Sequence, residues 1–218
     1  MMPSKTSFAE LYEETKNKMG FNGCHGFDHV ERVMKMCRYI GKREKADLEV
    51  LKFAALLHDI DRRKEDEGLI ECHAEGSAET AKDMLSFQGL SIEFTDKVSS
   101  CIRTHRYRKG ETPVSVEAKI LADADRLDAM GAVGIGRAFL FGGEHGQRLW
   151  VDRIASKKER FFPGMDASEY SPVIEYRLKL SKLKEGMLTR TGKKEAEERH
   201  RFMEAFFKEL EDELSGKR

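Results

Sequence analysis

The chain has 218 residues, of which 39% are hydrophobic and 36% are charged, and its 39 Lys and Arg residues balance 39 Asp and Glu residues. Its length is that of one domain, or of one domain with a small extension, and its composition is too apolar and too neutral for a disordered chain. The charge balance disfavours a long nucleic acid or an anionic membrane as the partner. The longest apolar run, residues 129–136, is far shorter than the roughly 20 residues that a transmembrane helix needs, and the N-terminus has no apolar signal segment. The sequence therefore predicts a soluble, cytoplasmic protein.

Helical periodicity runs through most of the chain, which contains only four prolines and no alternation of polar and apolar residues typical of a strand. Thr6 or Ser7 is a candidate N-cap for the first helix, and Asp47 is a candidate N-cap for the third. Gly89 suits the end of the fourth helix. In chain order, we expect helices over residues 8–19, 30–41, 47–58, 77–88, 92–105, 115–130 and 193–214.

Glycine and proline gather in the segment 141–172, which interrupts the helical pattern. A long irregular segment inside a domain is commonly a functional lid. The sequence predicts a single all-α domain over residues 1–218, with a core at about 20–140, the irregular lid-like segment at 141–172 and C-terminal helices at 173–214. A stripe on the last helix could pack on its own core or on a second chain, which leaves a homodimer open; it consists of Phe202, Phe206 and Leu210.

Four of the expected helices each carry one polar, metal-ligating side chain on the apolar face. His58, His105 and Asp125 each end a set of apolar residues with the spacing i, i+3, i+4, i+7, and His29 begins another apolar stripe. One inward histidine is commonly a hydrogen-bonded core residue, but a buried aspartate costs several kcal/mol unless it is paired or binds a metal. Asp59 directly follows His58 and adds a second carboxylate to the inward-facing groups. A shared divalent cation would satisfy all of these groups at once.

Three segments resemble the H…HD…D motifs of the HD-domain superfamily of metal-dependent phosphohydrolases: HGFDHVERV (25–33), LKFAALLHDID (51–61) and ADADRLDAMG (122–131). The tail at 182–214 is similar to the C-terminal extension of a bacterial and archaeal branch that includes small nucleotide-pyrophosphate hydrolases. The resemblance covers residues 20 to 214, roughly. It implies a compact helical HD-domain bundle with a C-terminal helical extension.

The resemblance also implies a set of metal ligands, namely His29, His58, Asp59 and Asp125. His73 and His105 resemble positions that bind a second metal in some branches of the superfamily. The implied cofactor is a divalent cation, with Mn²⁺ favoured and Mg²⁺, Fe²⁺, Co²⁺, Ni²⁺ and Zn²⁺ as alternatives. Asp123 falls elsewhere on its helix, and we expect it to support the ligands or the helix end.

Further candidates would act on the phosphoryl group or on the attacking water. Arg32 shares a helical face with a predicted ligand and is expected to contact phosphoryl oxygens, as is His105 if it does not bind metal. Asp61, two residues after the His–Asp pair, is the preferred general acid or base over Glu65. Expected substrate contacts are His25, Arg62 and Arg106.

Hydrolysis of a phosphate ester or anhydride requires a nucleophile at neutral pH and positive charge around the phosphoryl oxygens, and a bound divalent cation supplies both. The resembled branch favours a small phosphorylated substrate, a nucleoside triphosphate that is cleaved to the monophosphate and pyrophosphate. The alternatives are a phosphomonoesterase or a cyclic-nucleotide phosphodiesterase, the latter favoured by two metals. A non-enzymatic alternative is a regulatory module that keeps the metal and binds a nucleotide.

Overall fold

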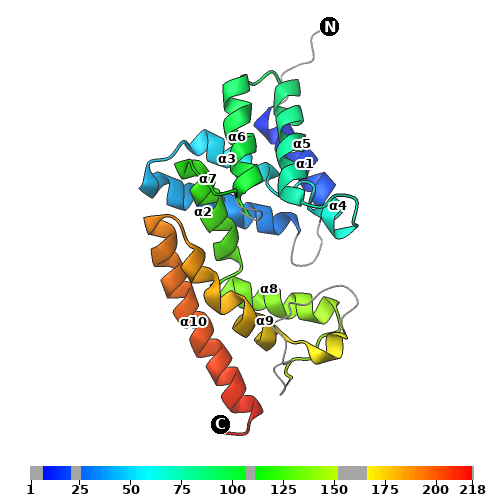
Figure 1. The fold of residues 1–218 in the computed structure, drawn as a ribbon, viewed down its shortest axis with the longest axis vertical. Coiled ribbons are helices and arrows are strands. Elements are labelled where there is room, and N and C mark those ends of the chain that lie inside the picture. The colour runs from blue at the N-terminus through cyan, green and yellow to red at the C-terminus, as the bar shows by residue number, and fades with distance from the viewer. Residues whose placement is uncertain (1–6, 21–25, 107–110, 152–165, 218) are drawn as a thin grey trace. The chain divides into compact units, whose positions relative to one another are not determined.

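The fold of the computed structural model is all-α, and no strand occurs among the residues that it describes, 7–20, 26–106, 111–151 and 166–217 (Figure 1). The chain divides into two units, which are described one at a time. The first unit contains residues 1–125 and the short segment Leu188–Thr191, and the second contains Arg126–Met187 and Gly192–Arg218. The single domain over 1–218 stays a prediction.

The first unit is built from the helices that carry the candidate site: α1 (Phe8–Met19), α2 (Phe27–Glu44), α3 (Leu48–Leu57), α4 (Arg62–Asp66), α5 (His73–Phe87), α6 (Ile92–Thr104) and most of α7 (Val116–Asp128). The predicted caps are confirmed: Ser7 forms a capping box with Glu10, and the Asp47 side chain accepts hydrogen bonds from the first backbone N–H groups of α3. Gly89 follows α5 with a left-handed φ of 74°, a conformation that favours glycine.

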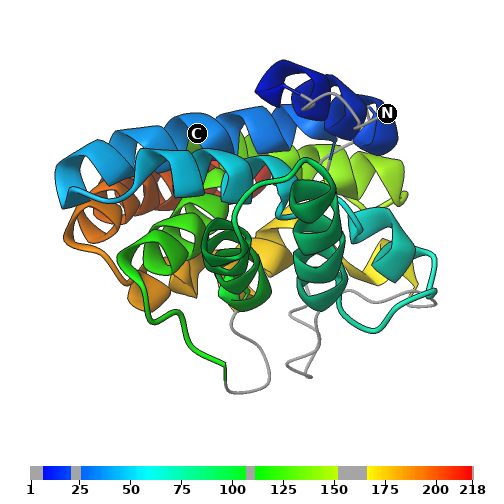
Figure 2. The same cartoon turned by 90° about the horizontal axis from the view of Figure 1, so that it is seen from above.

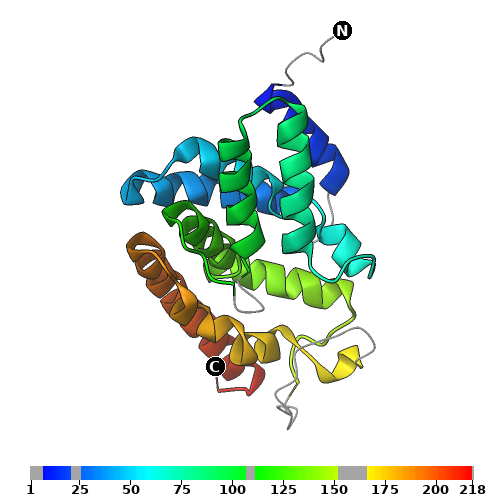
Figure 3. The same cartoon turned by 45° about the horizontal axis from the view of Figure 1, so that its top comes forward.

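Close helix pairs position the candidate site. α2 lies alongside α3, and α5 lies alongside α6, as the views in Figures 2 and 3 show. Gly41 allows α2 and α3 to approach, because a Cβ atom there would lie only 2.6 Å from Cδ1 of Leu51. Val33 and Ile40 of α2 and Leu51 of α3 are buried, and they belong to the packed core that supports these two helices.

Two carboxylates attach the segment Leu188–Thr191 to the first unit. Asp123, which is fully buried, accepts hydrogen bonds from the backbone N–H groups of Leu188 and Thr189, both at 2.8 Å, and from the Thr189 hydroxyl at 2.7 Å. Glu44 accepts from the backbone N–H and the hydroxyl of Thr191. The role of Asp123 is therefore to hold a segment distant in sequence, which differs from the expected support of ligands or of a helix end.

The second unit contains α8 (Gly131–Glu144), the short helices η2 (Ala167–Glu169) and η3 (Leu180–Gly186), α9 (Pro172–Leu178) and the greater part of α10 (Arg190–Leu214). Phe207 of α10 stacks on Tyr176 of α9, with ring centroids 4.1 Å apart. α8 extends into the segment expected to be irregular, and residues 152–165 lie outside the described residues, so the lid stays a prediction. Phe202 and Phe206 are exposed, and the homodimer also stays a prediction.

None of the helices in the described part of the chain is both long enough and apolar enough to cross a membrane.

Candidate metal centre

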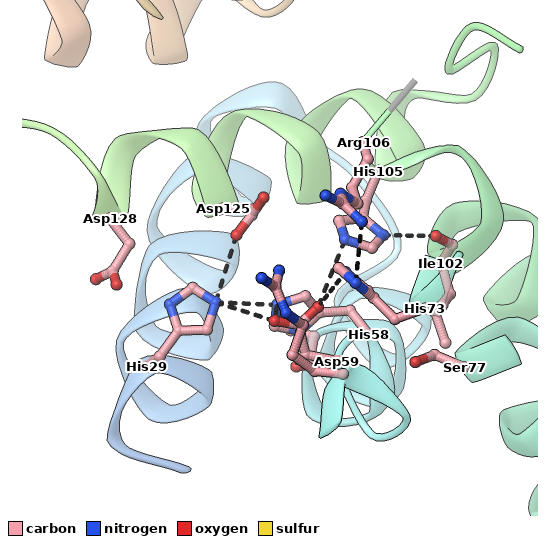
Figure 4. Close-up of polar contacts among 12 residues, drawn as sticks. His29, His58, Asp59, His73, Ser77, Ile102, His105, Arg106, Asp125 and Asp128 are labelled. Atoms are coloured by element: carbon pink, nitrogen blue, oxygen red, sulfur yellow. Dashed lines mark hydrogen bonds and ion pairs between the residues drawn. The ribbon is translucent and has the colours of Figure 1, made fainter. Parts of the chain in front are cut away.

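Six side chains with metal-ligating atoms come together in the first unit, from five separate parts of the chain (Figure 4). The first group combines His29 of α2, His58 directly after α3 and Asp125 of α7. The second group combines Asp59, His73 at the start of α5 and His105 directly after α6. Within each group the ligand atoms all lie within 4.8 Å of one another. The structure thus brings together the four predicted ligands and both histidines predicted for a second metal.

The ring nitrogens of two histidines are oriented by backbone carbonyl groups. Nδ1 of His58 lies 2.8 Å from the carbonyl oxygen of Ala55, and Nδ1 of His105 lies 2.6 Å from that of Ile102. Because a carbonyl oxygen only accepts, each Nδ1 carries the proton, and each Nε2 presents its lone pair to the centre. Nε2 of His58 also lies 3.2 Å from Nε2 of His29, a separation that two ligands of one cation can adopt.

Asp59 lies between the two groups and faces both. Its Oδ2 is 3.8 Å from Nε2 of His29 and 3.9 Å from Nε2 of His58, while its Oδ1 is 2.9 Å from Nε2 of His73 and 3.7 Å from Nε2 of His105. Oδ1 of Asp59 and Nε2 of His73 are buried without a hydrogen-bond partner. Such atoms are costly in a folded protein. The donor set therefore fits one divalent cation in each group, with Asp59 able to contact both.

The charge states of the ligands also suit a cation. Burial raises the pKa of Asp59, but the neighbouring His58 and His73 outweigh it and hold this pKa well below its ordinary value. The pKa of Asp125 is also lowered. Burial raises this pKa, but the hydrogen bond and the charge of His29 lower it by more. Burial lowers the pKa of His105 to about 4. At neutral pH both carboxylates are charged and His105 is neutral, as metal ligation requires.

Glu65 and Arg106, which the sequence suggested for other roles, form an outer layer around the second group. Glu65 of α4 accepts a hydrogen bond from the backbone N–H of His73 at 2.7 Å, and the same carboxylate oxygen lies 2.7 Å from Nδ1 of His73. Arg106 donates to both Glu65 oxygens, at 2.8 and 3.0 Å. Burial raises the pKa of Glu65, but the His73 N–H and Arg106 outweigh it and lower this pKa to about 2. The sequence offered only the spacing from the His–Asp pair, and on that signal Asp61 was preferred over Glu65.

Asp61 is buried, and its contacts tie it to other parts of the first unit. Its carboxylate accepts hydrogen bonds from the Thr80 hydroxyl and from Lys18, and it pairs with Lys64 at 2.9 Å. Its backbone N–H donates to the Ser77 hydroxyl of α5 at 3.1 Å. Burial raises the pKa of Asp61, but Thr80 and Lys64 outweigh it and lower this pKa. Asp61 anchors the turn after Asp59, and its catalytic role stays a prediction.

The predicted cationic contacts are distributed around the centre. Arg32 of α2 pairs with Asp28 of the same helix, and Arg62 pairs with Asp66 within 3.1 Å. Burial lowers the pKa of Arg62, but nearby carboxylates, Asp59 first among them, outweigh burial and raise this pKa. Arg62 therefore interacts electrostatically with a predicted metal ligand. Asp125 is the most exposed of the six ligands, with 28% of its side chain accessible, so its group is open to solvent. His25 lies outside the described residues.

The part of the chain that carries the candidate metal centre matches a known protein family. Residues 26–130 match the model of the HD domain. The chain is 38% identical over 197 residues to the uncharacterized protein YpgQ of Bacillus subtilis (strain 168), a match that covers 88% of this chain and 85% of YpgQ. All six residues of the two groups lie within the segment that matches the HD domain.

Solved structures also resemble this chain, over 95% of its length. The structure of Bacillus subtilis YpgQ in complex with ADP has a TM-score of 0.73 and 32% identity to this chain, and the match covers 95% of this chain and 98% of that one. An HD-superfamily hydrolase from Bacillus thuringiensis has a TM-score of 0.70 and 28% identity, covering 95% of this chain and 96% of that one. The sequence motifs and the fold therefore point to the same family.

Proposed function

The chain belongs to the HD-domain family, and from that premise we propose that it is a divalent-metal-dependent phosphohydrolase that cleaves a nucleoside triphosphate to the monophosphate and pyrophosphate. The observation that carries the proposal is the position of Asp59 between two groups of ligand atoms, with Oδ1 unpartnered beside Nε2 of His73. Mixed imidazole and carboxylate donors suit Mn²⁺, which we take as the first candidate ahead of Mg²⁺, Fe²⁺, Co²⁺, Ni²⁺ and Zn²⁺.

Each part of the centre has a task in this chemistry. His29, His58, Asp59 and Asp125 would hold the first cation, which when bound lowers the pKa of its water and polarises a phosphoryl oxygen. The exposed edge at Asp125 gives substrate access to this group. Positive charge for the phosphate oxygens would come from arginines close to the centre, and the half-buried Arg62 is the first candidate because the charge of Asp59 raises its pKa.

The nucleotide part of the proposal has two supports. The resembled branch of the family includes nucleotide-pyrophosphate hydrolases, and the related YpgQ has been crystallised in complex with ADP. A substrate with several adjacent phosphates suits a centre in which Asp59 faces two groups, because Asp59, His73 and His105 would hold a second cation that would supply positive charge for a pyrophosphate leaving group.

A panel of phosphorylated substrates tests the proposal. The metal-stripped protein is loaded with Mn²⁺ and assayed for released phosphate and, separately, for pyrophosphate. We expect pyrophosphate from nucleoside triphosphates, and we expect Asp125→Asn to abolish it while the exposed control Asp96→Asn retains it. Phosphate from monophosphates would instead indicate a phosphomonoesterase, and no product across the panel would indicate a nucleotide-binding module.

The arrangement also favours a second candidate, a cyclic-nucleotide phosphodiesterase. Hydrolysis of a diester is commonly assisted by two cations that clamp the attacking and leaving oxygens. The Asp59, His73 and His105 group supplies donors for the second of these cations. Including cyclic nucleotides in the same panel separates the two candidates, since only a phosphodiesterase releases a monophosphate from them.

A further inference from the structure

A cavity of about 450 Å³ lies between α2 and α3, which run side by side in the first unit (Figure 3). Its apolar lining comes from Met34 and Cys37 of α2 and from Leu48 and Leu51 of α3. None of the residues that line it is one of the six ligands of the metal centre. The volume is within the range of pockets that hold small molecules.

The deeper part of this lining is apolar and uncharged. Cys37 and Leu51 are buried, and Met34 is half-buried. Burial raises the pKa of the Cys37 thiol well above its ordinary value, so the thiol is neutral at physiological pH. Leu48 is 37% exposed at the edge of the cavity. A ligand with an apolar body would therefore gain free energy by covering this lining.

Charged side chains surround the apolar lining, and three of the four are cations. Lys52 has partners within the chain, because it pairs with Glu49 at 3.6 Å and lies over the ring of Phe8 at 3.9 Å. Lys35 and Arg38 are exposed, and neither makes a hydrogen bond or an ion pair with another residue in the described part of the chain. The edge of the cavity thus carries two cations whose charge is not compensated.

The spacing of these two cations allows them to act together. Lys35 and Arg38 are three residues apart on α2, so their side chains lie on one face of the helix and can reach the same anionic group. Nearer the start of α2, by contrast, Arg32 pairs with Asp28. An unpaired cation on a surface does not by itself indicate a site. Two of them beside an apolar cavity match a ligand that is apolar and anionic at once.

We propose that the cavity between α2 and α3 binds a small apolar anion, a molecule with an aromatic or aliphatic body and one carboxylate or sulfonate group. The body packs against Met34, Cys37 and Leu51, and the anionic group pairs with Lys35 and Arg38. An inorganic anion would leave the apolar lining in water, and a neutral ligand would leave both cations without a partner. The inference goes beyond the proposed function and does not rest on it.

Fluorescence titration with anilinonaphthalene sulfonate tests the proposal, because this dye combines apolar rings with one sulfonate. Its uncharged counterpart, phenylnaphthylamine, has the same rings and reports the apolar contribution alone. Both dyes are titrated into the wild type, Lys35→Gln/Arg38→Gln, Met34→Trp and the control Lys42→Gln. Lys42 is a matched control because it is also an exposed lysine of α2 but does not line the cavity.

The two dyes separate recognition of charge from apolar packing. We expect the sulfonate dye to bind Lys35→Gln/Arg38→Gln about 10-fold more weakly than the wild type, because two exposed ion pairs are lost. The uncharged dye should bind this variant and the wild type equally well. Met34→Trp, whose larger side chain fills part of the cavity, should weaken the binding of both dyes, and Lys42→Gln should change neither. Lys35→Gln/Arg38→Gln decides the question even if Met34→Trp fails to fold, since it changes only exposed residues.

The proposal is overturned if the sulfonate dye shows no saturable binding to the wild type, or if it binds Lys35→Gln/Arg38→Gln as tightly as the wild type. Displacement of the dye by pyrophosphate, which has no apolar body, would also overturn it by placing the dye at the metal centre. These outcomes are separate from the failure of the proposed function. A protein that binds the dye as expected but hydrolyses none of the phosphorylated substrates would keep this inference and refute the phosphohydrolase.

Discussion

Oδ1 of Asp59 lies 2.9 Å from Nε2 of His73, and both buried atoms lack a hydrogen-bond partner. The other oxygen of Asp59 faces His29 and His58. One carboxylate thus links ligands from α2, from the end of α3 and from the start of α5, and it is the residue on which both groups depend.

Replacing Asp59 by asparagine should therefore impair both groups at once. The amide is neutral and offers one oxygen, so it cannot contact two cations as a carboxylate does. Loss of a residue that only hydrogen-bonds a metal ligand lowers metal affinity roughly 10–100-fold. Because Asp59 is itself a predicted ligand, we expect Asp59→Asn to lower the affinity for both Mn²⁺ ions by more than this. Metal counting after dialysis checks this, with Asp96→Asn on the surface as the control. Retention of both ions in Asp59→Asn would remove this residue from the ligand set.

Acid should destabilise the metal-free protein through His105. Burial lowers the pKa of His105 in the folded chain to about 4, against an ordinary value of 6.5. As the pH falls below about 6.5, the unfolded chain takes up a proton that the folded chain does not, so stability is lost down to about pH 4. The loss is on the order of 3 kcal/mol. Urea unfolding at several pH values measures it, and His105→Gln should flatten the dependence in this window. An equal slope in both proteins would contradict the assignment.

Glu65, Asp59 and Asp125, whose pKa values are lowered in the folded chain, add to this loss of stability in acid, at lower pH than His105 does. Each has a folded pKa below its ordinary value, so its contribution is present above the ordinary pKa and is lost as the pH falls toward the folded pKa. For Glu65 the loss of stability falls between pH 4.5 and about pH 2. The contributions of the carboxylates and of His105 can be separated, because His105 titrates at the higher pH.

Asp123→Ala should destabilise the first unit without touching the ligand set. The buried carboxylate accepts three hydrogen bonds from Leu188 and Thr189, and its loss leaves two backbone N–H groups without a partner. We expect the free energy of unfolding to fall by about 3 kcal/mol. Urea unfolding measures it, and the exposed Asp83→Ala on α5 should stay within about 0.5 kcal/mol of the wild type. A small effect at Asp123 would mean that the segment is held by other contacts.

Asp61→Asn separates a structural role from a catalytic one. Its contacts with Thr80, Lys64 and Ser77 favour the structural role. We expect a loss of about 1–3 kcal/mol in stability, with Mn²⁺ content and kcat little changed. Stability and turnover are measured on the same preparation. A stable variant whose kcat falls more than about 100-fold would instead support a general acid or base at this position.

The inner face of each helix could be read from the sequence. His29, His58, His105 and Asp125 were placed by apolar spacing alone, and the structure gathers all of them in one centre. The spacing succeeds because a helix has a fixed periodicity and a buried polar group stands out against an apolar stripe. Two caps, at Ser7 and Asp47, were equally readable because capping depends on neighbouring residues.

The outer layer could not be read in this way. Glu65 lies in α4, a five-residue helix of charged residues without an apolar stripe, and its role comes from contact with α5. Asp123 was recognised as lying off the inner face, but its partners are 65 and 66 residues away in the sequence. Hydrogen bonds between distant segments depend on tertiary packing, which local periodicity does not encode.

Anomalous diffraction at the manganese absorption edge, from crystals of the Mn²⁺-loaded protein, tests the central claim most directly. We expect one peak within coordination distance of His29, His58 and Asp125, and a second within that distance of His73 and His105, with Asp59 between them. A protein that shows no manganese peak beside these six residues would contradict the metal centre and the hydrolytic function that depends on it.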